Sequence, residues 1–274
     1  MNITNTNFRQ NSYYYTSFGS MRRKTFDKLG NVINCNYTNF NRKDIDWSKL
    51  TDFLNSRYSF QDKTNINIYG CSDASDVYTL AINLINRLGS NVLKRFNISA
   101  SDLSEDIIKQ VQEGKIYLHK KDIEYLTSQN AMRFFDYDYN AETKFFENIE
   151  FHPYKVRKEL FNDINFSAKD VREDVKNHNF SNEVFIFRNG WGFNCLEEQN
   201  NIASNLFKNS NNKTLVIIGQ SDLYKSGASD LLQENGFKGI NSDIFTRAET
   251  NYPSNPIGMP KEPNKFEQFI LFEK

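Results

Sequence analysis

The stretch Ile66-Asn67-Ile68-Tyr69-Gly70-Cys71-Ser72 decides the fold, because a short apolar run stops at a glycine and small polar residues. Two more stretches have the same form, Ile98-Ser99-Ala100-Ser101-Asp102 and Val184-Phe185-Ile186-Phe187-Arg188-Asn189. Such a run followed by an amphipathic helix is typical of a strand–helix unit in an open parallel sheet. Ligands of these sheets bind outside the carboxyl ends of the strands. The three polar ends therefore predict one small-molecule site, with a nucleoside-bearing cofactor as the first expectation.

Segments between the apolar runs have the spacing of helices. Val77, Leu80 and Leu84 share one helical face that stops at Gly89, and Ser104 is placed to cap the next helix. Further strands are expected at residues 164–166, 184–187, 214–218 and 266–272. Because parallel crossovers are right-handed almost without exception, this order predicts a doubly wound, mostly parallel α/β sheet.

The periodicity also predicts how the chain is divided. Residues 1–62 are expected to form an N-terminal arm with helices, one over residues 21–32 and one that starts after Asp46. Residues 63–274 are expected to form the sheet domain. Weak alternation near residue 150 predicts a small antiparallel insertion within residues 115–153.

The composition excludes several classes of function. The 34 Lys and Arg residues balance 34 Asp and Glu residues, so no global field favours nucleic acid. No apolar run reaches the roughly 18 residues of a membrane span, and the polar N-terminus lacks a signal sequence. The three cysteines and three histidines lack the spacing of metal ligands or of a disulfide framework. We therefore expect a cytoplasmic protein with no bound metal.

The turn after the first strand argues against a phosphate-bearing cofactor. The dinucleotide fingerprint needs three glycines, and only Gly70 is present. Asp73 and Asp76 would repel phosphate, but they suit a ligand that carries an amine or a sulfonium. An ordinary strand-to-helix turn explains the same residues, since acidic side chains are favoured at helix N-termini.

The other polar residues at strand ends each have two interpretations. Asp102 can accept the hydroxyls of a ribose or can cap a helix. Asp170 can bind an adenine amino group or can simply end a strand. Arg188 is unusual directly after four apolar residues, and it either faces a ligand or pairs with a buried carboxylate. Arg22 belongs to a basic run that is either a solvated face or part of a lid.

Taken together, these segments resemble the chemotaxis receptor methyltransferases, the CheR-type S-adenosylmethionine-dependent protein-glutamate O-methyltransferases. Residues 70–81 are similar to that family's GCSTGEEPYSLA stretch, and residues 98–104 are similar to its ATDID segment. Residues 185–189 resemble IFCRN, and residues 215–222 resemble LFLGHSE. The resemblance covers roughly residues 66–222, in order and at compatible spacing.

The resemblance implies a class I methyltransferase, a Rossmann-like fold with a seven-stranded sheet, and S-adenosylmethionine as the cofactor. It implies Gly70 and Cys71 beside the methionine part, Asp102 at the ribose, Asp170 near adenine, Arg188 and Asn189 on the pocket lining, and Ser72, Asp76, Leu103 and Val171 as further cofactor-binding residues. Arg188 and Arg22 are the implied catalytic residues, which would orient an acceptor carboxylate. The implied partner is a protein substrate, such as a chemoreceptor-like protein.

Three departures from the family's pattern bear on activity. Ala74 replaces its second glycine, and Ser75 replaces the first of its paired glutamates. Gly190-Trp191-Gly192-Phe193 replaces an aliphatic run that ends in Tyr-Phe, so the tyrosine hydroxyl is absent and Trp191 is expected at the pocket mouth. Three hypotheses stay open: a carboxylate methyltransferase, a methyltransferase with another acceptor, and a catalytically silent binding module.

Overall fold

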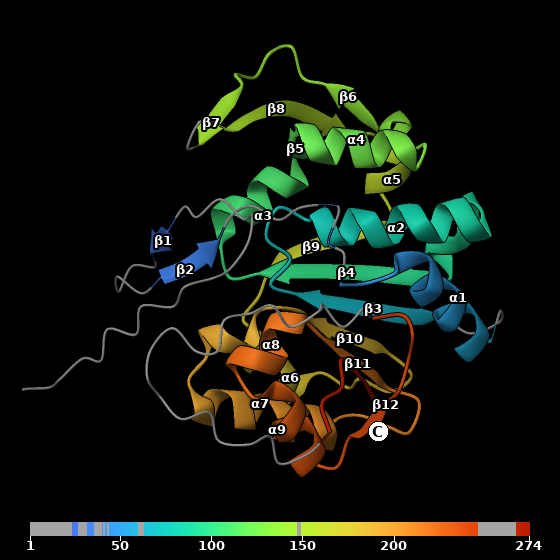
Figure 1. Cartoon of the computed structure of the whole chain (residues 1–274), viewed down its shortest axis with the longest axis vertical. Coiled ribbons are helices and arrows are strands. Elements are labelled where there is room, and N and C mark those ends of the chain that lie inside the picture. Colours follow the sequence, from blue (N-terminus) through green and yellow to red (C-terminus); the bar gives the residue numbers. More distant parts are fainter. Residues whose placement is uncertain are drawn as a thin grey trace, which may run out of the picture.

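The computed structural model describes residues 24–26, 32–35, 40, 42, 44–59, 63–146, 149–245 and 267–274. Within these residues seven strands form one sheet, in the order β12-β13-β11-β10-β3-β4-β9 (Figure 1). The strands of this sheet are β3 (Thr64–Tyr69), β4 (Phe96–Asp102), β9 (Ile164–Ala168), β10 (Val184–Phe187), β11 (Leu215–Ile218), β12 (Lys238–Ile240) and β13 (Leu271–Glu273).

The strand order reverses in the middle of the sheet. From the central strand β3 the chain moves outward through β4 to β9, and it then returns to the other side of β3 through β10 and β11. These five strands run parallel, whereas β13 runs antiparallel to both β11 and β12. The point between β3 and β10 is therefore a topological switch point, where such sheets bind ligands. The doubly wound, Rossmann-like fold predicted from the sequence is confirmed.

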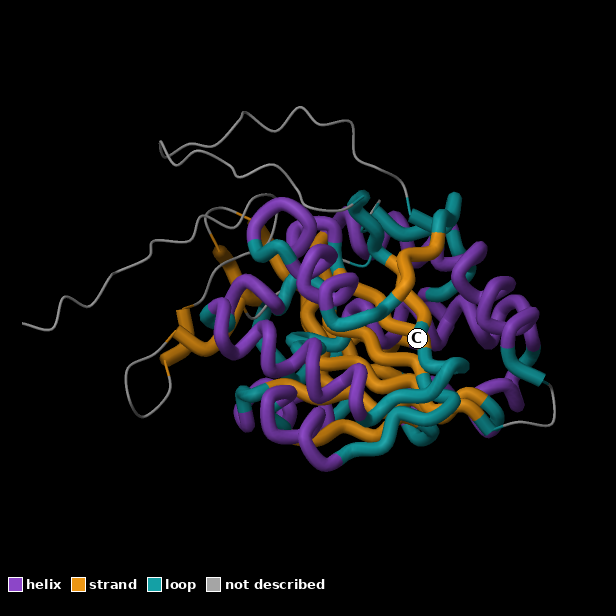
Figure 2. Tube along the Cα trace, turned by 90° about the horizontal axis from the view of Figure 1, so that it is seen from below, coloured by secondary structure: helices purple, strands orange, loops and turns teal. Residues whose placement is uncertain are grey.

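Both faces of the sheet are apolar, which explains why the strands are continuous hydrophobic runs. Successive side chains of a strand point to opposite faces. Val184 and Ile186 of β10 therefore enter one core, and Phe185 and Phe187 enter the other. Figure 2 shows the strands as a central layer with helices on both sides.

The helices cover the sheet in two groups. One core contains α1 (Trp47–Arg57), α2 (Ser75–Leu88) and α3 (Glu105–Gln112), and the other contains α6 (Val171–Asn177), α7 (Leu196–Lys208) and α9 (Ala228–Glu234). The expected helix boundaries at Asp46, Ser104 and Gly89 are confirmed: Asp46 caps α1, Ser104 caps α3 and Gly89 ends α2. Among the described residues, none of the helices combines the length and the apolar character needed to cross a membrane.

The insertion between α3 and β9 is a second, antiparallel sheet at the top of Figure 1. Its strands are β5 (Lys115–His119), β6 (Phe135–Tyr137), β7 (Lys144–Phe146) and β8 (Ile149–Val156), and the helices α4 (Lys120–Ser128) and α5 (Lys158–Phe161) lie beside it in the chain. Strand β8 pairs with each of the other three. The small antiparallel insertion is thus present, while the division of the chain at residue 62 stays a prediction.

Three short strands were not predicted correctly. The helix expected over residues 21–32 is wrong for Lys24–Phe26, which forms β1 and pairs with β2 (Val32–Cys35). Strand β12 was missed because it has three residues and pairs only with β13, more than 30 positions further along the chain. The last strand begins at Leu271, because the described residues 267–270 lie outside it, and residue 266 lies outside the described residues.

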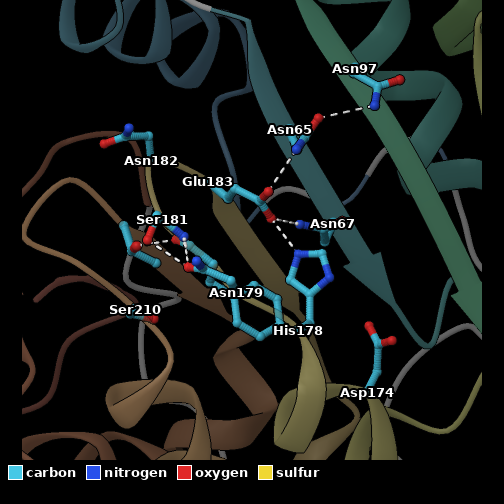
Figure 3. A network of polar contacts seen from close by, with 12 residues as sticks. Asn65, Asn67, Asn97, Asp174, His178, Asn179, Ser181, Asn182, Glu183 and Ser210 are labelled. Carbon is cyan, nitrogen blue, oxygen red and sulfur yellow. Dashed lines mark hydrogen bonds and ion pairs between the residues drawn. The ribbon is translucent and has the colours of Figure 1, made fainter.

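The amino-terminal half of the sheet contains a buried carboxylate. Glu183, just before β10, accepts hydrogen bonds from the side-chain amides of Asn65 and Asn67, both at 2.6 Å (Figure 3). His178, after α6, contacts the same carboxylate at 2.7 Å. We call these four residues the amino-end network. Each carboxylate oxygen has a partner, so the network connects α6, β3 and β10 without leaving Glu183 unpaired.

Candidate functional site

Strand register aligns the last residues of neighbouring strands at one edge of the sheet. Tyr69 pairs with both Ser101 and Phe187, so the turns after these residues lie side by side. The N–H of Cys71 donates to the carbonyl of Ser101 at 2.9 Å, which connects two of the turns. We call this edge the rim. It comprises residues 70–76, 102–104, 169–171, 188–191 and 219–222.

The first turn of the rim has an unusual backbone. Gly70 (φ +65°), Ser72 (φ +51°) and Ala74 (φ +66°) all lie in the left-handed region. For residues with a side chain this conformation costs about 1–2 kcal/mol each, and such strain clusters at ligand sites. Ala74 stands at the N-cap position of helix α2, and Asp73 Oδ1 accepts from the N–H of Ser75, the first residue of the helix, at 3.1 Å.

Asp102 is held in place by two backbone groups of the rim. Its Oδ2 accepts from the N–H of Ser72 at 2.9 Å, and its Oδ1 accepts from the N–H of Ser104 at 3.0 Å. The side chain is buried. A carboxylate oxygen has two lone pairs, so the same two oxygens can also accept the hydroxyls of a ribose. The predicted role of Asp102 fits this geometry and stays a prediction.

Arg188 forms buried ion pairs on both sides of its guanidinium. Its Nη1 lies 2.6 Å from Asp76 Oδ2, and its Nη2 lies 2.8 Å from Asp44 Oδ2. Only 2% of the Arg188 side chain is exposed. Arg42 also contacts Asp76, at 3.4 Å. Burial alone lowers the pKa of Arg188, but the two carboxylates outweigh it and raise that pKa. Burial raises the pKa of Asp44, but Arg188 outweighs it and holds that pKa below its usual value.

Two atoms of this ion-pair group have no hydrogen-bond partner within the described residues. They are Asp76 Oδ1 and Arg188 Nε, and both are buried. A buried polar atom without a partner costs stability and calls for an explanation, of which a ligand group is one. Asp76 Oδ1 is an anionic acceptor, and it fits the amino group of S-adenosylmethionine. The residues of the first turn therefore suit the expected cofactor.

On the side of the rim that is expected to bind adenine, the carboxylate already has a cationic partner. Asp170 caps α6 through the N–H of Arg172 at 2.9 Å, and its carboxylate also pairs with the Arg172 guanidinium. Burial raises the pKa of Asp170, but Arg172 outweighs it and the net shift is downward. Val171 is buried, whereas Leu103 is 47% exposed beside Asp102. An exposed leucine at the rim offers a flat apolar surface to an aromatic base.

Two residues of the site, one on the rim and one in contact with it, were missed by the sequence analysis. Asp44 pairs with Arg188 from a segment 144 positions away, and Asp222 accepts from the N–H of Asn189 at 2.6 Å across 33 positions. Asn189 itself has φ +57°, and its side-chain oxygen accepts from the N–H of Ser221 at 3.2 Å. No local pattern marks these contacts, because each depends on which strands become neighbours in the sheet.

The remaining expectations concern Arg22, Trp191 and metal binding. Arg22 lies outside the described residues. The expectation that Trp191 reshapes the pocket mouth is wrong, because Trp191 is fully buried in the second core beside Phe187. Phe193 is the exposed residue of this loop, at 53%. Among the described residues, no group of three His, Cys, Asp or Glu side chains can hold a metal ion.

Comparison with known proteins gives the family of this chain. Residues 36–237 match the family described as CheR methyltransferase, SAM binding domain. Among solved structures, a TehB-like SAM-dependent methyltransferase from Corynebacterium glutamicum ATCC 13032 Kitasato is 12% identical over 73% of this chain and 77% of its own, with a TM-score of 0.36. Magnesium protoporphyrin IX methyltransferase from Synechocystis PCC 6803, with bound SAH, is 14% identical over 75% and 80%, with a TM-score of 0.38. A search of the curated proteins finds no match.

Proposed function

Because this chain belongs to the CheR methyltransferase family, we propose that it transfers the methyl group of S-adenosylmethionine to a protein carboxylate. The observation that carries the proposal is Asp76 Oδ1, a buried carboxylate oxygen at the switch point with no partner in the described residues. S-adenosylmethionine supplies an electrophilic methyl group on a positively charged sulfur. An acidic first turn favours both that charge and the amino group of the cofactor.

In this proposal, different residues of the rim bind different parts of the cofactor. Asp76 accepts the amino group, and Asp102 accepts the ribose hydroxyls. Leu103 and Val171 provide apolar surface for adenine, next to Asp170. The side-chain nitrogen of Asn189 points away from Ser221, because Ser221 can only donate to the oxygen. In the proposal, the side-chain nitrogen of Asn189 is the group left to donate to the cofactor.

An acceptor carboxylate needs orientation but no general base. A glutamate side chain has a pKa of about 4.3, so it is already ionised near neutral pH. Holding the two reactants together at attack distance supplies up to roughly 7–11 kcal/mol of the barrier. Both terminal nitrogens of Arg188 are paired with carboxylates, so removal of Asp44 would free Nη2 as a further donor to an acceptor. We therefore expect Asp44→Ala to increase acceptor methylation, provided that the chain stays folded.

We propose a protein partner that docks on the insertion. Exposed apolar side chains occur there. Tyr137 and Phe145 lie on one face of the sheet and Tyr139 contacts Tyr137, while Ile149 lies on the other face. Tyr139 and Phe145 are 88% and 71% exposed, and apolar surface of this kind marks interaction sites. The double variant Tyr139→Ser/Phe145→Ser should reduce methylation of the acceptor while leaving cofactor affinity unchanged. Unchanged methylation would contradict this docking site.

A catalytically silent module is the second candidate. Two observations favour it: both ends of the Arg188 guanidinium are occupied by carboxylates, and Phe193 brings no hydroxyl to the rim. Such a protein would bind the cofactor, or only a partner, without transferring methyl groups.

One experiment separates the candidates. The chain is incubated with methyl-labelled S-adenosylmethionine and a cell lysate, and the label on protein is tested for release as methanol in base. Base-labile label supports carboxylate methylation, because esters hydrolyse and N-methyl groups do not. Base-stable label would indicate another acceptor. Calorimetric binding of S-adenosylhomocysteine without any transfer supports the silent module. No binding at millimolar ligand would contradict methyl transfer and would leave only a module that binds a partner.

A further inference from the structure

Asp222 caps a helix and also connects two turns of the rim. It lies in the first turn of α8 (Gln220–Lys225), and its Oδ2 accepts from the N–H of Gly219 at 2.8 Å, which is an ordinary capping contact. The same carboxylate also crosses to the neighbouring turn. It accepts from the N–H of Asn189 at 2.6 Å and from the N–H of Trp191 at 3.2 Å. One buried side chain thus connects the turns that follow β10 and β11.

The turn that Asp222 holds has a left-handed backbone at Asn189. Its φ is +57°, a conformation in which asparagine is enriched but which still costs more than the right-handed one. The two turns also touch directly, because a Cβ added at Gly219 would lie 2.2 Å from Asn189 Oδ1. The hydroxyl of Ser221 donates to that same oxygen. Strain of this kind persists only where surrounding contacts over-determine the backbone.

The contacts of Asp222 also demand a carboxylate. Its three partners are backbone N–H groups, which can only donate. Both of its oxygens accept, so an asparagine at this position would turn an NH2 group toward at least one donor. Burial raises the pKa of Asp222 to about 7, while the three N–H groups and Arg188 oppose that rise.

We propose that Asp222 is a positioning residue for the cofactor site, which it serves by fixing the turn that carries Arg188 and Asn189. The proposal rests on the proposed function, because it assumes that Arg188 and Asn189 line the cofactor site. Asp222 itself acts through the backbone of the turn. It therefore controls cofactor affinity without contacting the cofactor.

The test compares Asp222→Asn with Glu183→Gln, which alters a buried carboxylate of the amino-end network. Both variants are studied by calorimetry with S-adenosylhomocysteine, at a temperature where circular dichroism shows that they are folded. Asp222→Asn should weaken binding by at least about tenfold, since it loses a buried hydrogen-bond acceptor, whereas Glu183→Gln should stay within about twofold. An equal affinity in the two variants would overturn the proposal.

Hydrogen exchange tests the same claim in the unaltered chain, and it does not depend on whether a variant folds. The amides of Asn189 and Trp191 should exchange as slowly as those of β10, although both residues lie outside any strand. Exchange as fast as that of the exposed residues 139 and 140 would overturn the proposal. If the unaltered chain fails to bind S-adenosylhomocysteine, the proposed function falls, and hydrogen exchange alone decides whether Asp222 holds the turn.

Discussion

The two ends of the parallel sheet both bury carboxylates, and they differ in how completely those carboxylates are hydrogen-bonded. At the amino end, both oxygens of Glu183 accept hydrogen bonds (Figure 3). At the rim, one oxygen of Asp76 and the Nε of Arg188 have no partner within the described residues. Saturated buried groups stabilise one conformation, whereas unsaturated ones cost stability unless a ligand completes them. This difference is in accord with the proposed cofactor site at the rim.

Removing Arg188 is expected to have the largest effect. Arg188→Met leaves Asp44 and Asp76 without their buried cation, so the free energy of unfolding should fall by about 3–5 kcal/mol. Urea denaturation measures this change. Arg157→Met is the control, since the ion pair of Arg157 with Asp136 is exposed to solvent and should contribute little to stability. Similar losses in the two variants would show that Arg188 is not a buried ion-pair centre.

Glu183→Gln tests whether the amino end contributes to stability and not to cofactor binding. The glutamine offers only one acceptor oxygen to the amides of Asn65 and Asn67, so one donor is left without a good partner. We expect the free energy of unfolding to fall by about 1–3 kcal/mol, with no change in cofactor affinity. Thermal and urea unfolding measure the first effect, and calorimetry measures the second. A marked loss of cofactor affinity would contradict the division of roles between the two ends.

At the rim, Asp102→Ala should lower cofactor affinity, unlike Glu183→Gln at the amino end. Loss of the carboxylate that accepts the ribose hydroxyls should weaken S-adenosylhomocysteine binding by at least about tenfold, or about 1.4 kcal/mol. The matched control is Asp106→Ala, which removes an exposed carboxylate from the first turn of α3. An affinity within twofold of the unaltered chain would refute the ribose role of Asp102.

The smallest expected effect is the pH dependence of the amino-end network. The hydrogen bond to Glu183 is the main cause that raises the pKa of His178 above its usual 6.5, and burial only partly opposes it. A raised pKa means that His178 stabilises the fold fully below about pH 6.5, and that this contribution disappears as the pH rises through the folded-state pKa. His178→Gln should therefore cost up to about 1 kcal/mol at pH 5.5 and almost nothing at pH 9. A cost that grows with pH would contradict the ion pair.

The sequence predicts the parallel units of the fold well, because their signals are local. The strand at residues 184–187 has the predicted bounds, and the cap at Ser104 follows from side-chain chemistry within one turn. The short strands β1 and β12 were not predicted. Each has three residues, and three residues are too few to distinguish helical from strand periodicity.

The site was predicted only in part, for a related reason. The residues that end strands could be found, since the strands locate them. Asp44 and Asp222 could not, because their partners lie 144 and 33 positions away and become neighbours only when β10 is placed between β3 and β11. The burial of Trp191 likewise depends on α8 and the second core, and its own neighbourhood in the sequence gives no sign of it.

The most direct test of the central claim is a crystal structure of this chain with S-adenosylhomocysteine. The account predicts that the amino group of the ligand lies within about 3 Å of Asp76 Oδ1 and that the ribose hydroxyls contact Asp102. A ligand bound elsewhere, with Asp76 Oδ1 still without a partner, would contradict the claim that the rim is the cofactor site.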